Sequence, residues 1–305
     1  MTFSPALPRT AEARGILMMI GAIAIFTVMD ALAKGIGQRT DTVMALWSRY
    51  AGQTLVVLAM VAPRLKSVLR TRYPKLQFLR SIFLLCATTC FFFGLSMIGL
   101  AEATAIMDLN PVFITLGAAL ILGERFGARR AVGVGLSLIG ALIIIRPGSD
   151  LFSYAALLPL AAAFFYSAYA LTTRFVGRDE DAWTSLLYTA LMGAVLLSLL
   201  VPFFWVRPDP TALLMMSLIG FCGAFSQLLL IRALMIAEAS LIAPFAYAGL
   251  IFATLWGYLF FNEIPDLPTV IGMLIIAGSG VYVWYRETRV ARRAAAEVPA
   301  RAPIR

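Results

Sequence analysis

Stretches of about 20 consecutive, mostly apolar residues recur along this chain, and they restrict its fold more than any other feature. A helix needs about 20 such residues to cross the hydrocarbon core of a bilayer. Hydrophobic residues make up 61% of the 305 residues, and charged residues only 13%. A soluble domain carries roughly twice that share of charged residues, because its surface must face water. The sequence therefore predicts an all-α integral membrane protein.

The apolar stretches and the loops between them predict ten transmembrane helices. The expected ranges are 15–37, 43–62, 78–99, 102–123, 128–146, 152–174, 182–204, 211–234, 239–261 and 267–285. Residues 1–14 are expected to form a cytoplasmic leader, and residues 287–305 a disordered, basic cytoplasmic tail. Ala31-Leu32-Ala33 resembles a signal-peptide cleavage site. The run before it is long and has a counterpart in the second half, so it is interpreted as the first helix.

The basic residues between these stretches predict the orientation. With a cytoplasmic N-terminus, the outer loops hold only Arg39, Arg146 and Arg207. The inner segments hold Arg9, Arg14, Arg64, Lys66, Arg70, Arg72, Lys75, Arg80, Arg125, Arg129, Arg130, Arg174, Arg178 and six arginines of the tail. Lys and Arg concentrate on the cytoplasmic side of membrane proteins, so both termini are expected there. The net charge of +9 is explained by this orientation and does not indicate a nucleic-acid partner.

One stretch of the chain returns in altered form in the second half. In 95–124 and again in 233–263, Ala-Glu-Ala followed by Thr or Ser opens an apolar run that a Glu closes. The opening and closing residues are Glu102 and Glu124 in the first copy, and Glu238 and Glu263 in the second. Such duplication is typical of transporters. We expect two five-helix repeats, 15–146 and 147–286, and the odd number of helices makes the second repeat inverted.

The composition excludes several other classes. There is no histidine and there are three cysteines, so neither a Cys/His zinc site nor a disulfide framework is expected, and Cys86 and Cys90 are interpreted as small buried side chains. A serine nucleophile would lack a histidine base, and no glycine-rich phosphate loop is present. We therefore expect neither an enzyme, a cofactor, a metal nor an ATP-driven pump. A non-transporting membrane scaffold is the alternative from a different class.

Charged residues inside the spans are the first candidates for function, because a charge in the bilayer interior is costly and usually faces the protein interior. Asp30 and Lys34 lie four apart on one helix face, which predicts either a mutual ion pair or a proton-coupling site. Asp108 is a second candidate, for substrate binding and for proton coupling. Arg49 either reaches the outer headgroups or meets a substrate carboxylate. Facilitated diffusion without protons is the simpler energetic alternative.

Neutral polar and aromatic residues complete the expected site. The substrate-binding candidates are Trp47, Asp108, Asn110, Tyr166, Tyr169, Gln227 and Tyr247, with Pro111 and Pro244 as hinges. A mostly apolar pocket with a few polar groups suits a small amphipathic solute. The closing residues Glu124 and Glu263 are interpreted as hydrogen-bonding anchors at helix corners. Glycines 133, 140, 272 and 280 predict close helix contacts, in a scaffold or a dimer interface.

The corner motifs resemble those of the drug/metabolite transporter superfamily, and within it of ten-helix exporters built from two EamA domains. The first copy reads Gly123-Glu124-Arg125-Phe126, then Gly133 and Gly140, and the second reads Asn262-Glu263-Ile264-Pro265, then Gly272 and Gly280. Pro111 lies thirteen residues before Glu124, as in the family pattern. The second copy departs from it, because Leu250 takes that place and Pro244 lies nearer the start.

The resemblance implies a secondary transporter of small neutral or zwitterionic metabolites in the bacterial inner membrane. It favours amino-acid efflux, of aromatic amino acids in particular, by alternating access around a cavity between the two repeats. Uptake of a vitamin such as riboflavin is the alternative within the same superfamily. The expected partners are the small-molecule substrate and the lipid bilayer, and the default oligomeric state is a monomer.

Overall fold

The structure, a computed structural model, describes residues 9–122, 128–147, 154–176, 180–236 and 243–296, and every regular element in these ranges is helical. In chain order they are α1 (Arg9–Arg39), α2 (Thr42–Val61), η1 (Ala62–Arg64), α3 (Leu65–Val68), α4 (Pro74–Met97), α5 (Leu100–Met107), α6 (Asn110–Leu122), α7 (Ala128–Ile145), η2 (Tyr154–Ala156), α8 (Leu157–Val176), α9 (Ala182–Leu200), η3 (Val201–Phe204), α10 (Pro210–Ile236), η4 (Ala243–Tyr247), α12 (Ala248–Phe261) and α13 (Leu267–Ala296). The all-helical class is confirmed.

Seven helical segments of the described ranges are long and apolar enough to cross a membrane, and two shorter apolar helices, Ala131–Ile145 and Phe245–Phe261, accompany them. α2 is 20 residues long but carries Ser48, Arg49, Gln53 and Thr54, all buried. This composition indicates a helix whose polar side chains are covered by its neighbours. The number of ten crossings stays a prediction.

Two helices are longer than the sequence suggested. α1 starts at Arg9, inside the expected leader, and α13 runs on through Ala296, into the expected disordered tail. The reason is that a helix does not need to end where the apolar run ends. Alanine and arginine are strong helix formers, and both extensions are rich in them. Residues 1–8 and 297–305, beyond these two helices, lie outside the described residues.

The expected helix 102–123 is in fact two helices. α5 ends at Met107, Asp108 and Leu109 form a turn, and α6 begins at Asn110. Pro111 disfavours helical geometry for the residue before it and cannot donate a backbone hydrogen bond. In the second copy a short 3-10 helix, η4, precedes α12. α6 begins 14 residues before Glu124 and α12 begins 15 residues before Glu263, so an α-helix begins at a similar place in each copy although their prolines do not match.

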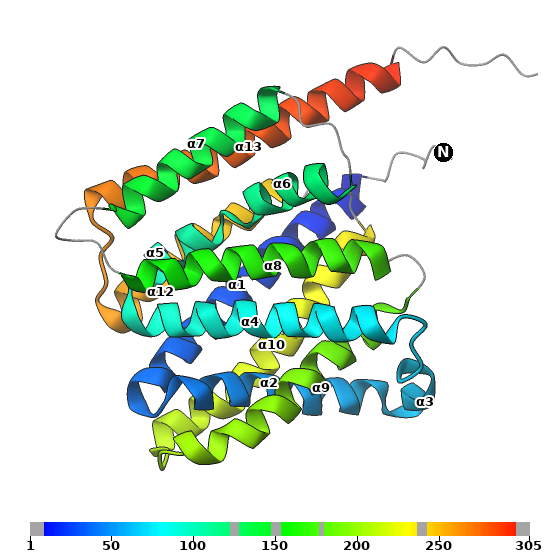
Figure 1. Cartoon of the computed structure of the whole chain (residues 1–305), viewed down its shortest axis with the longest axis vertical. Helices are drawn as coiled ribbons and strands as arrows, with labels where there is room; N and C mark the ends of the chain where they lie inside the picture. The colour runs from blue at the N-terminus through cyan, green and yellow to red at the C-terminus, as the bar shows by residue number, and fades with distance from the viewer. Residues whose placement is uncertain (1–8, 123–127, 148–153, 177–179, 237–242, 297–305) are drawn as a thin grey trace, which may run out of the picture.

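The helices run roughly side by side, with α7 and α13 forming a pair along one edge (Figure 1). Elsewhere α1 packs along α10, α4 packs along α8 and α9, and α2 packs against both α9 and α10. The α7–α13 pair touches the rest mainly through α5, α6 and η4. This leaves α1, α4, α5, α6, α8, α10 and α12 around the middle of the molecule.

Glycines allow two of these crossings to be very close. A Cβ on Gly52 of α2 would lie 2.9 Å from the Cα of Gly220 on α10. A Cβ on Gly272 of α13 would lie 2.6 Å from the carbonyl oxygen of Gly140 on α7. Beside the second crossing, the hydroxyls of Ser137 and Ser279 are hydrogen-bonded at 2.6 Å. Close helix contacts were expected at these glycines, and Gly140 and Gly272 make one between α7 and α13.

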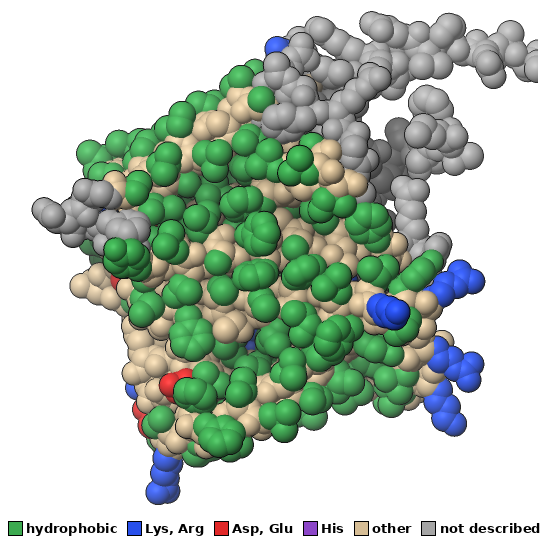
Figure 2. Space-filling view, in the orientation of Figure 1, with side chains coloured by type: hydrophobic (Ala, Val, Ile, Leu, Met, Phe, Trp, Pro, Cys, Tyr) green, Lys and Arg blue, Asp and Glu red, His purple; other side chains and the backbone are tan. Residues whose placement is uncertain are grey.

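The two ends of the molecule differ in charge. The start of α1, the end of α13 and α3 lie at one end of the bundle (Figure 1), and the basic segment 64–75 belongs to that end. Figure 2 shows a mostly apolar side surface with basic side chains at its margins. Three ion pairs lie toward the opposite end: Arg39–Asp209, Lys34–Glu263 and Arg146–Asp266. This arrangement is that of a multi-pass membrane protein.

Candidate functional site

Five helices place a polar residue at nearly the same depth. Asp30 lies nine residues before the end of α1, Arg49 seven after the start of α2, Thr88 nine before the end of α4, Asp108 eight after the start of α5, and Tyr166 nine after the start of α8. These helix ends lie at one end of the bundle, because short turns join α1 to α2 and α4 to α5, and Pro159 of α8 packs on Gly94 of α4. At 1.5 Å per residue the five residues lie about 10–14 Å inside it, near the middle of a core about 30 Å thick.

Arg49 is nine-tenths buried in this layer. Its Nη1 donates to the hydroxyl of Thr88 at 2.7 Å. Its guanidinium carbon lies 5.0 Å from the ring centre of Tyr50 and 5.7 Å from that of Phe92. Its Nε is buried and has no hydrogen-bond partner. Within the described ranges no carboxylate lies within ion-pair distance of Arg49, so its charge is only partly compensated.

Asp30 faces Arg49 from α1. The charge that acts on its carboxylate is that of Arg49, although the two groups are too far apart to form an ion pair. The expected ion pair between Asp30 and Lys34 is wrong. Lys34 instead binds Glu263, with Nζ 2.5 Å from Oε1. The i to i+4 spacing permits the pair on one helix, but the end of α12 supplies a better partner from another part of the chain.

The Lys34–Glu263 pair joins three elements near the end of the bundle. Lys34 also donates to the carbonyl of Ile98 at 2.6 Å, and Glu263 accepts the backbone N–H of Leu100 at 2.9 Å. Glu263 is held there because Asn262 ends α12 in the left-handed conformation, with φ 54°. The expectation of a corner hydrogen bond is thus confirmed for Glu263, whereas Glu124 lies outside the described residues.

A second buried arginine lies near the start of α4. Arg80 was expected in a basic inner loop, but it is only 4% exposed. Its guanidinium donates to Thr173 at 2.7 Å, to Gln77 at 2.9 Å, to the Ser185 carbonyl at 3.2 Å and to the Tyr169 hydroxyl at 3.1 Å. All three of its nitrogens are therefore engaged, which assigns Arg80 to holding α4, α8 and α9 together.

Tyr169 connects this arginine to the mid-depth layer. Its ring lies 5.6 Å from that of Tyr166, one turn earlier on α8. In that layer the Tyr50 hydroxyl donates to Thr88 at 3.0 Å. The predicted pair Tyr166 and Tyr169 thus lies on the interior side of α8, next to the surroundings of Arg49.

Asp108 belongs to a different group, at the break between α5 and α6. Its Oδ2 is buried and has no hydrogen-bond partner, and it interacts electrostatically with the hydroxyl of Tyr247. The Asn110 amide donates to the Met107 carbonyl at 3.0 Å, and its own carbonyl accepts the hydroxyl of Ser167 at 2.9 Å. The break therefore places one acid near a tyrosine of the second half of the chain.

The other predicted residues are Trp47, Gln227, Pro111 and Pro244. The Trp47 indole donates to Ser198 of α9 at 2.9 Å and packs against Trp205, so the structure places it at the α2–α9 edge. Gln227 lies one turn after Gly223, which packs against Gln53, Met29 and Arg49. Pro111 is exposed in the first turn of α6, and Pro244 lies in η4.

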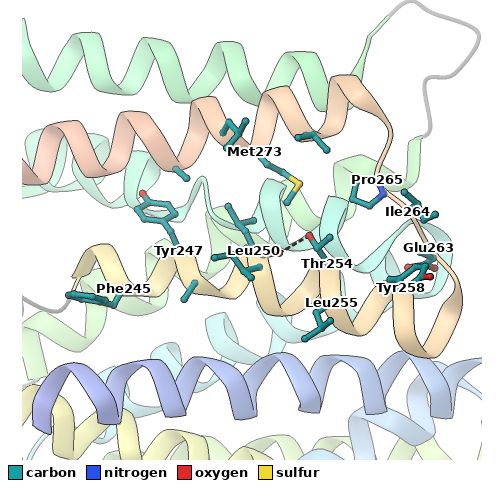
Figure 3. A pocket seen from close by; sticks show the side chains of 15 residues that line it. Phe245, Tyr247, Leu250, Thr254, Leu255, Tyr258, Glu263, Ile264, Pro265 and Met273 are labelled. Carbon is teal, nitrogen blue, oxygen red and sulfur yellow. Dashed lines mark hydrogen bonds between the residues drawn. The ribbon is translucent and has the colours of Figure 1, made fainter. Parts of the chain in front are cut away.

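A pocket of about 1030 Å³ lies between α12 and α13 (Figure 3). Its walls are almost entirely apolar, from Leu250, Met273 and their neighbours, and Tyr247, Thr254 and Glu263 are its main polar groups. The Thr254 hydroxyl is already occupied by the Leu250 carbonyl at 2.7 Å. The Tyr247 hydroxyl points at Gly280 of α13, where an added Cβ would overlap it.

The sequence interpretation missed Thr88, Phe92 and the interior place of Arg80. Threonine and phenylalanine are ordinary in an apolar stretch, so nothing marked them. Arg80 lies three residues inside the expected span 78–99 and could have been noticed as an intramembrane charge. Within the described ranges, no group of three or more His, Cys, Asp and Glu side chains could hold a metal ion.

Comparisons with known proteins match this architecture. The model of the EamA-like transporter family matches residues 13–146 and 153–285. An S-adenosylmethionine uptake transporter of Rickettsia prowazekii is 27% identical, over 90% of this chain and 94% of that protein. A riboflavin transporter of Vibrio cholerae is 28% identical, over 92% and 96%. The pseudopaline exporter CntI of Pseudomonas aeruginosa is 27% identical, over 86% and 93%.

A solved crystal structure shares the fold, with a TM-score of 0.65 over 92% of this chain and 99% of that one, at 22% identity. The relatives are transporters and not enzymes. Two matches to one family model, one in each half, together with the apolar helices, establish what the sequence resemblance suggested. The chain belongs to the EamA-like transporter family of the drug/metabolite transporter superfamily and is a multi-pass membrane protein.

Proposed function

We propose that this protein is a secondary carrier of small zwitterionic metabolites, working by alternating access between two inverted five-helix repeats. The supporting observation is the polar layer at mid-depth, together with the break between α5 and α6. Discontinuous helices near the midplane are where secondary transporters bind their substrates. A buried charge in a membrane interior is costly and is retained where function needs it.

Three of the relatives suggest the chemical range. Their names give S-adenosylmethionine, riboflavin and pseudopaline as the transported compounds. Amino-acid efflux, which the motif resemblance favoured, has no support from these names beyond the class of transport. We therefore propose the wider class of zwitterions, with S-adenosylmethionine as the first compound to test and amino acids next.

A neutral aromatic solute such as riboflavin is the second candidate. The pocket between α12 and α13 favours it, because its apolar walls and its Tyr247 hydroxyl suit a flat, weakly polar molecule. Its volume lies at the upper end of the usual range for ligand pockets. Under this hypothesis the solute does not contact the charged layer around Arg49.

Uptake into proteoliposomes tests both candidates. The purified full-length protein is reconstituted, and exchange of labelled S-adenosylmethionine, riboflavin and a panel of amino acids is measured against protein-free vesicles. Exchange of a zwitterion supports the first proposal, and exchange of riboflavin alone supports the second. Exchange of none of these compounds would overturn both and favour the alternative of a non-transporting scaffold.

The same vesicles test energy coupling, which we assign to a proton exchanged at Asp30 or Asp108. Uptake is measured with and without an imposed pH gradient, in the wild type and in Asp108→Asn. Dependence on the gradient that disappears in the variant supports coupling through Asp108. Wild-type uptake that ignores the gradient identifies facilitated diffusion and removes the proton from the mechanism.

A further inference from the structure

Arg49 and Asp30 are two opposite charges that face each other in the middle of the bundle without meeting. Arg49 projects from α2 between α1, α4 and α10, where its stem passes Gly223. Asp30 projects from α1 and is half-buried. A buried charge without a partner is costly in a low-dielectric interior. Neither finds one among the described residues, while Lys34, the other cation of this helix, is taken by Glu263.

The guanidinium of Arg49 is oriented so that its Nε makes no hydrogen bond within the described part of the chain. Thr88 accepts from Nη1, and the rings of Tyr50 and Phe92 lie within 5.0 and 5.7 Å of the guanidinium carbon. Nε is buried without a partner in the described part of the chain, and together with Nη2 it forms one edge of the guanidinium. Two parallel hydrogen bonds to a carboxylate are the interaction that such an edge makes best.

Arg80 provides the contrast within the same protein. It is also buried, but Gln77, Thr173, Tyr169 and the Ser185 carbonyl saturate its guanidinium. A structural arginine in this fold is therefore fully hydrogen-bonded by neutral groups. The Nε of Arg49 has no partner among the described residues at similar burial, which points to an acceptor supplied from outside the chain.

We propose that Arg49 binds the carboxylate and Asp30 the ammonium group of a zwitterionic solute, so that the solute completes the charge pair that the protein leaves open. Thr88 is the positioning residue that fixes the guanidinium. This inference rests on the proposed carrier function and specifies its site. The proposed site should also be selective for zwitterions, because a solute that lacks either charge leaves one buried ion of the protein without its partner.

The closing experiment uses analogues that lack one charge each. Uptake of labelled S-adenosylmethionine into proteoliposomes is competed with decarboxylated S-adenosylmethionine, which lacks the carboxylate, and with the 2-oxo analogue, which lacks the ammonium. The same design is run with labelled leucine, 3-methylbutylamine and 4-methylpentanoate. The wild type is expected to prefer the zwitterion over both analogues by about 10- to 100-fold, the range of a charge-assisted hydrogen bond.

Each variant is expected to lose one preference and keep the other. Arg49→Gln should bind the zwitterion and its decarboxylated analogue equally, while it still discriminates against the analogue without the ammonium. Asp30→Asn should show the reverse. Because the readout is a ratio within one variant, a general loss of folded protein does not produce it. Arg39→Gln is the matched control, since Arg39 lies in an exposed pair with Asp209 at the end of α1, and both preferences should persist.

Arg49→Lys is the second variant, for the case that Arg49→Gln does not fold. It keeps the positive charge but lacks the two-nitrogen edge, and a preference reduced by about tenfold is expected. Unchanged ratios in a folded Arg49 variant would overturn the inference. Wild-type uptake of riboflavin without any zwitterion would also overturn it, while the carrier function would stand. Uptake of no compound would remove the carrier function itself, and the inference with it.

Discussion

Lys34 forms a buried ion pair that links two distant parts of the chain. Its Nζ binds a carboxylate of α12 and a carbonyl of the α4–α5 turn, and its side chain is only 3% exposed. Removing one member of a buried ion pair leaves the other without compensation. The pair therefore acts as a joint between the first and the second repeat.

Lys34→Met is expected to destabilise the protein by about 3 kcal/mol, because Glu263 stays ionised with only the Leu100 amide as partner. Thermal unfolding of the purified protein in detergent measures the change. Arg39→Gln breaks an exposed pair and should change stability by less than about 1 kcal/mol. The double variant Lys34→Met/Glu263→Gln should recover part of the loss. Equal melting of Lys34→Met and Arg39→Gln would show that the joint contributes nothing.

Asp266 gives a pH-dependent prediction outside the membrane spans. Hydrogen bonding to Arg146, then to Thr269, lowers the pKa of this carboxyl from 3.8 to about 2. A lowered pKa means that the folded protein holds the proton less tightly than the unfolded chain. The stabilisation by the carboxylate is therefore fully present above pH 4 and is lost as the pH falls toward 2.

Asp266→Asn should lower stability by at most about 1 kcal/mol, because the side chain is half exposed. Asparagine can still accept the Thr269 backbone N–H at the start of α13, so only the charge is lost. The difference between variant and wild type should stay constant from pH 8 to pH 5 and vanish near pH 2. A difference that instead grows as the pH falls would contradict the assignment.

At the scale of elements, the α7–α13 pair depends on backbone contact at its crossing. Gly140 and Gly272 bring each carbonyl oxygen within 3 Å of where the other residue's Cβ would lie. Gly278 of the same helix α13 has nothing within 4 Å of that position. The two kinds of glycine cannot be told apart in the sequence.

Gly272→Ala is expected to lower stability by about 1–3 kcal/mol, because the two helices must separate. Gly278→Ala should be neutral or raise stability by up to about 1 kcal/mol, since alanine is the better helix former. Melting temperatures of both variants in the same detergent decide this. The close crossing would be refuted by a neutral Gly272→Ala.

The whole molecule carries its basic segments at one end and its ion pairs at the other. If the basic end is cytoplasmic, Ser67 of α3 and Thr211 at the start of α10 lie on opposite sides of the membrane. Both side chains are exposed. This placement follows from the five crossings expected between the two positions, because five is an odd number.

Cysteine labelling in right-side-out vesicles tests the orientation, in a variant whose Cys86, Cys90 and Cys222 are replaced by serine. Thr211→Cys should react with a membrane-impermeant maleimide at once, because it faces the outside. Ser67→Cys should react only after permeabilisation. The reverse pattern would invert the orientation, and equal labelling of both positions in sealed vesicles would contradict the opposite placement.

Much of the fold followed from local properties of the sequence. Apolar length predicted most helix ranges to within a few residues, and Pro111 predicted a disturbance in the helix that contains it. The extensions of α1 and α13 were not predicted, because hydropathy indicates which residues lie in the bilayer and not where a helix ends. Of the site, the intramembrane charges were visible as candidates, since any charge in such a run is unusual.

By itself, then, the sequence determined the membrane class, the duplication and the presence of Asp30, Arg49 and Asp108 inside apolar stretches. Only the tertiary structure decided their partners. Lys34 pairs with Glu263, 229 positions later, and not with its helical neighbour. Arg80 donates to four neutral acceptors on three helices, whereas the Nε of Arg49 has no partner among the described residues. The physical reason is that pairing energy in a low-dielectric interior depends on distances of a few ångströms between helices, and no local pattern specifies those distances.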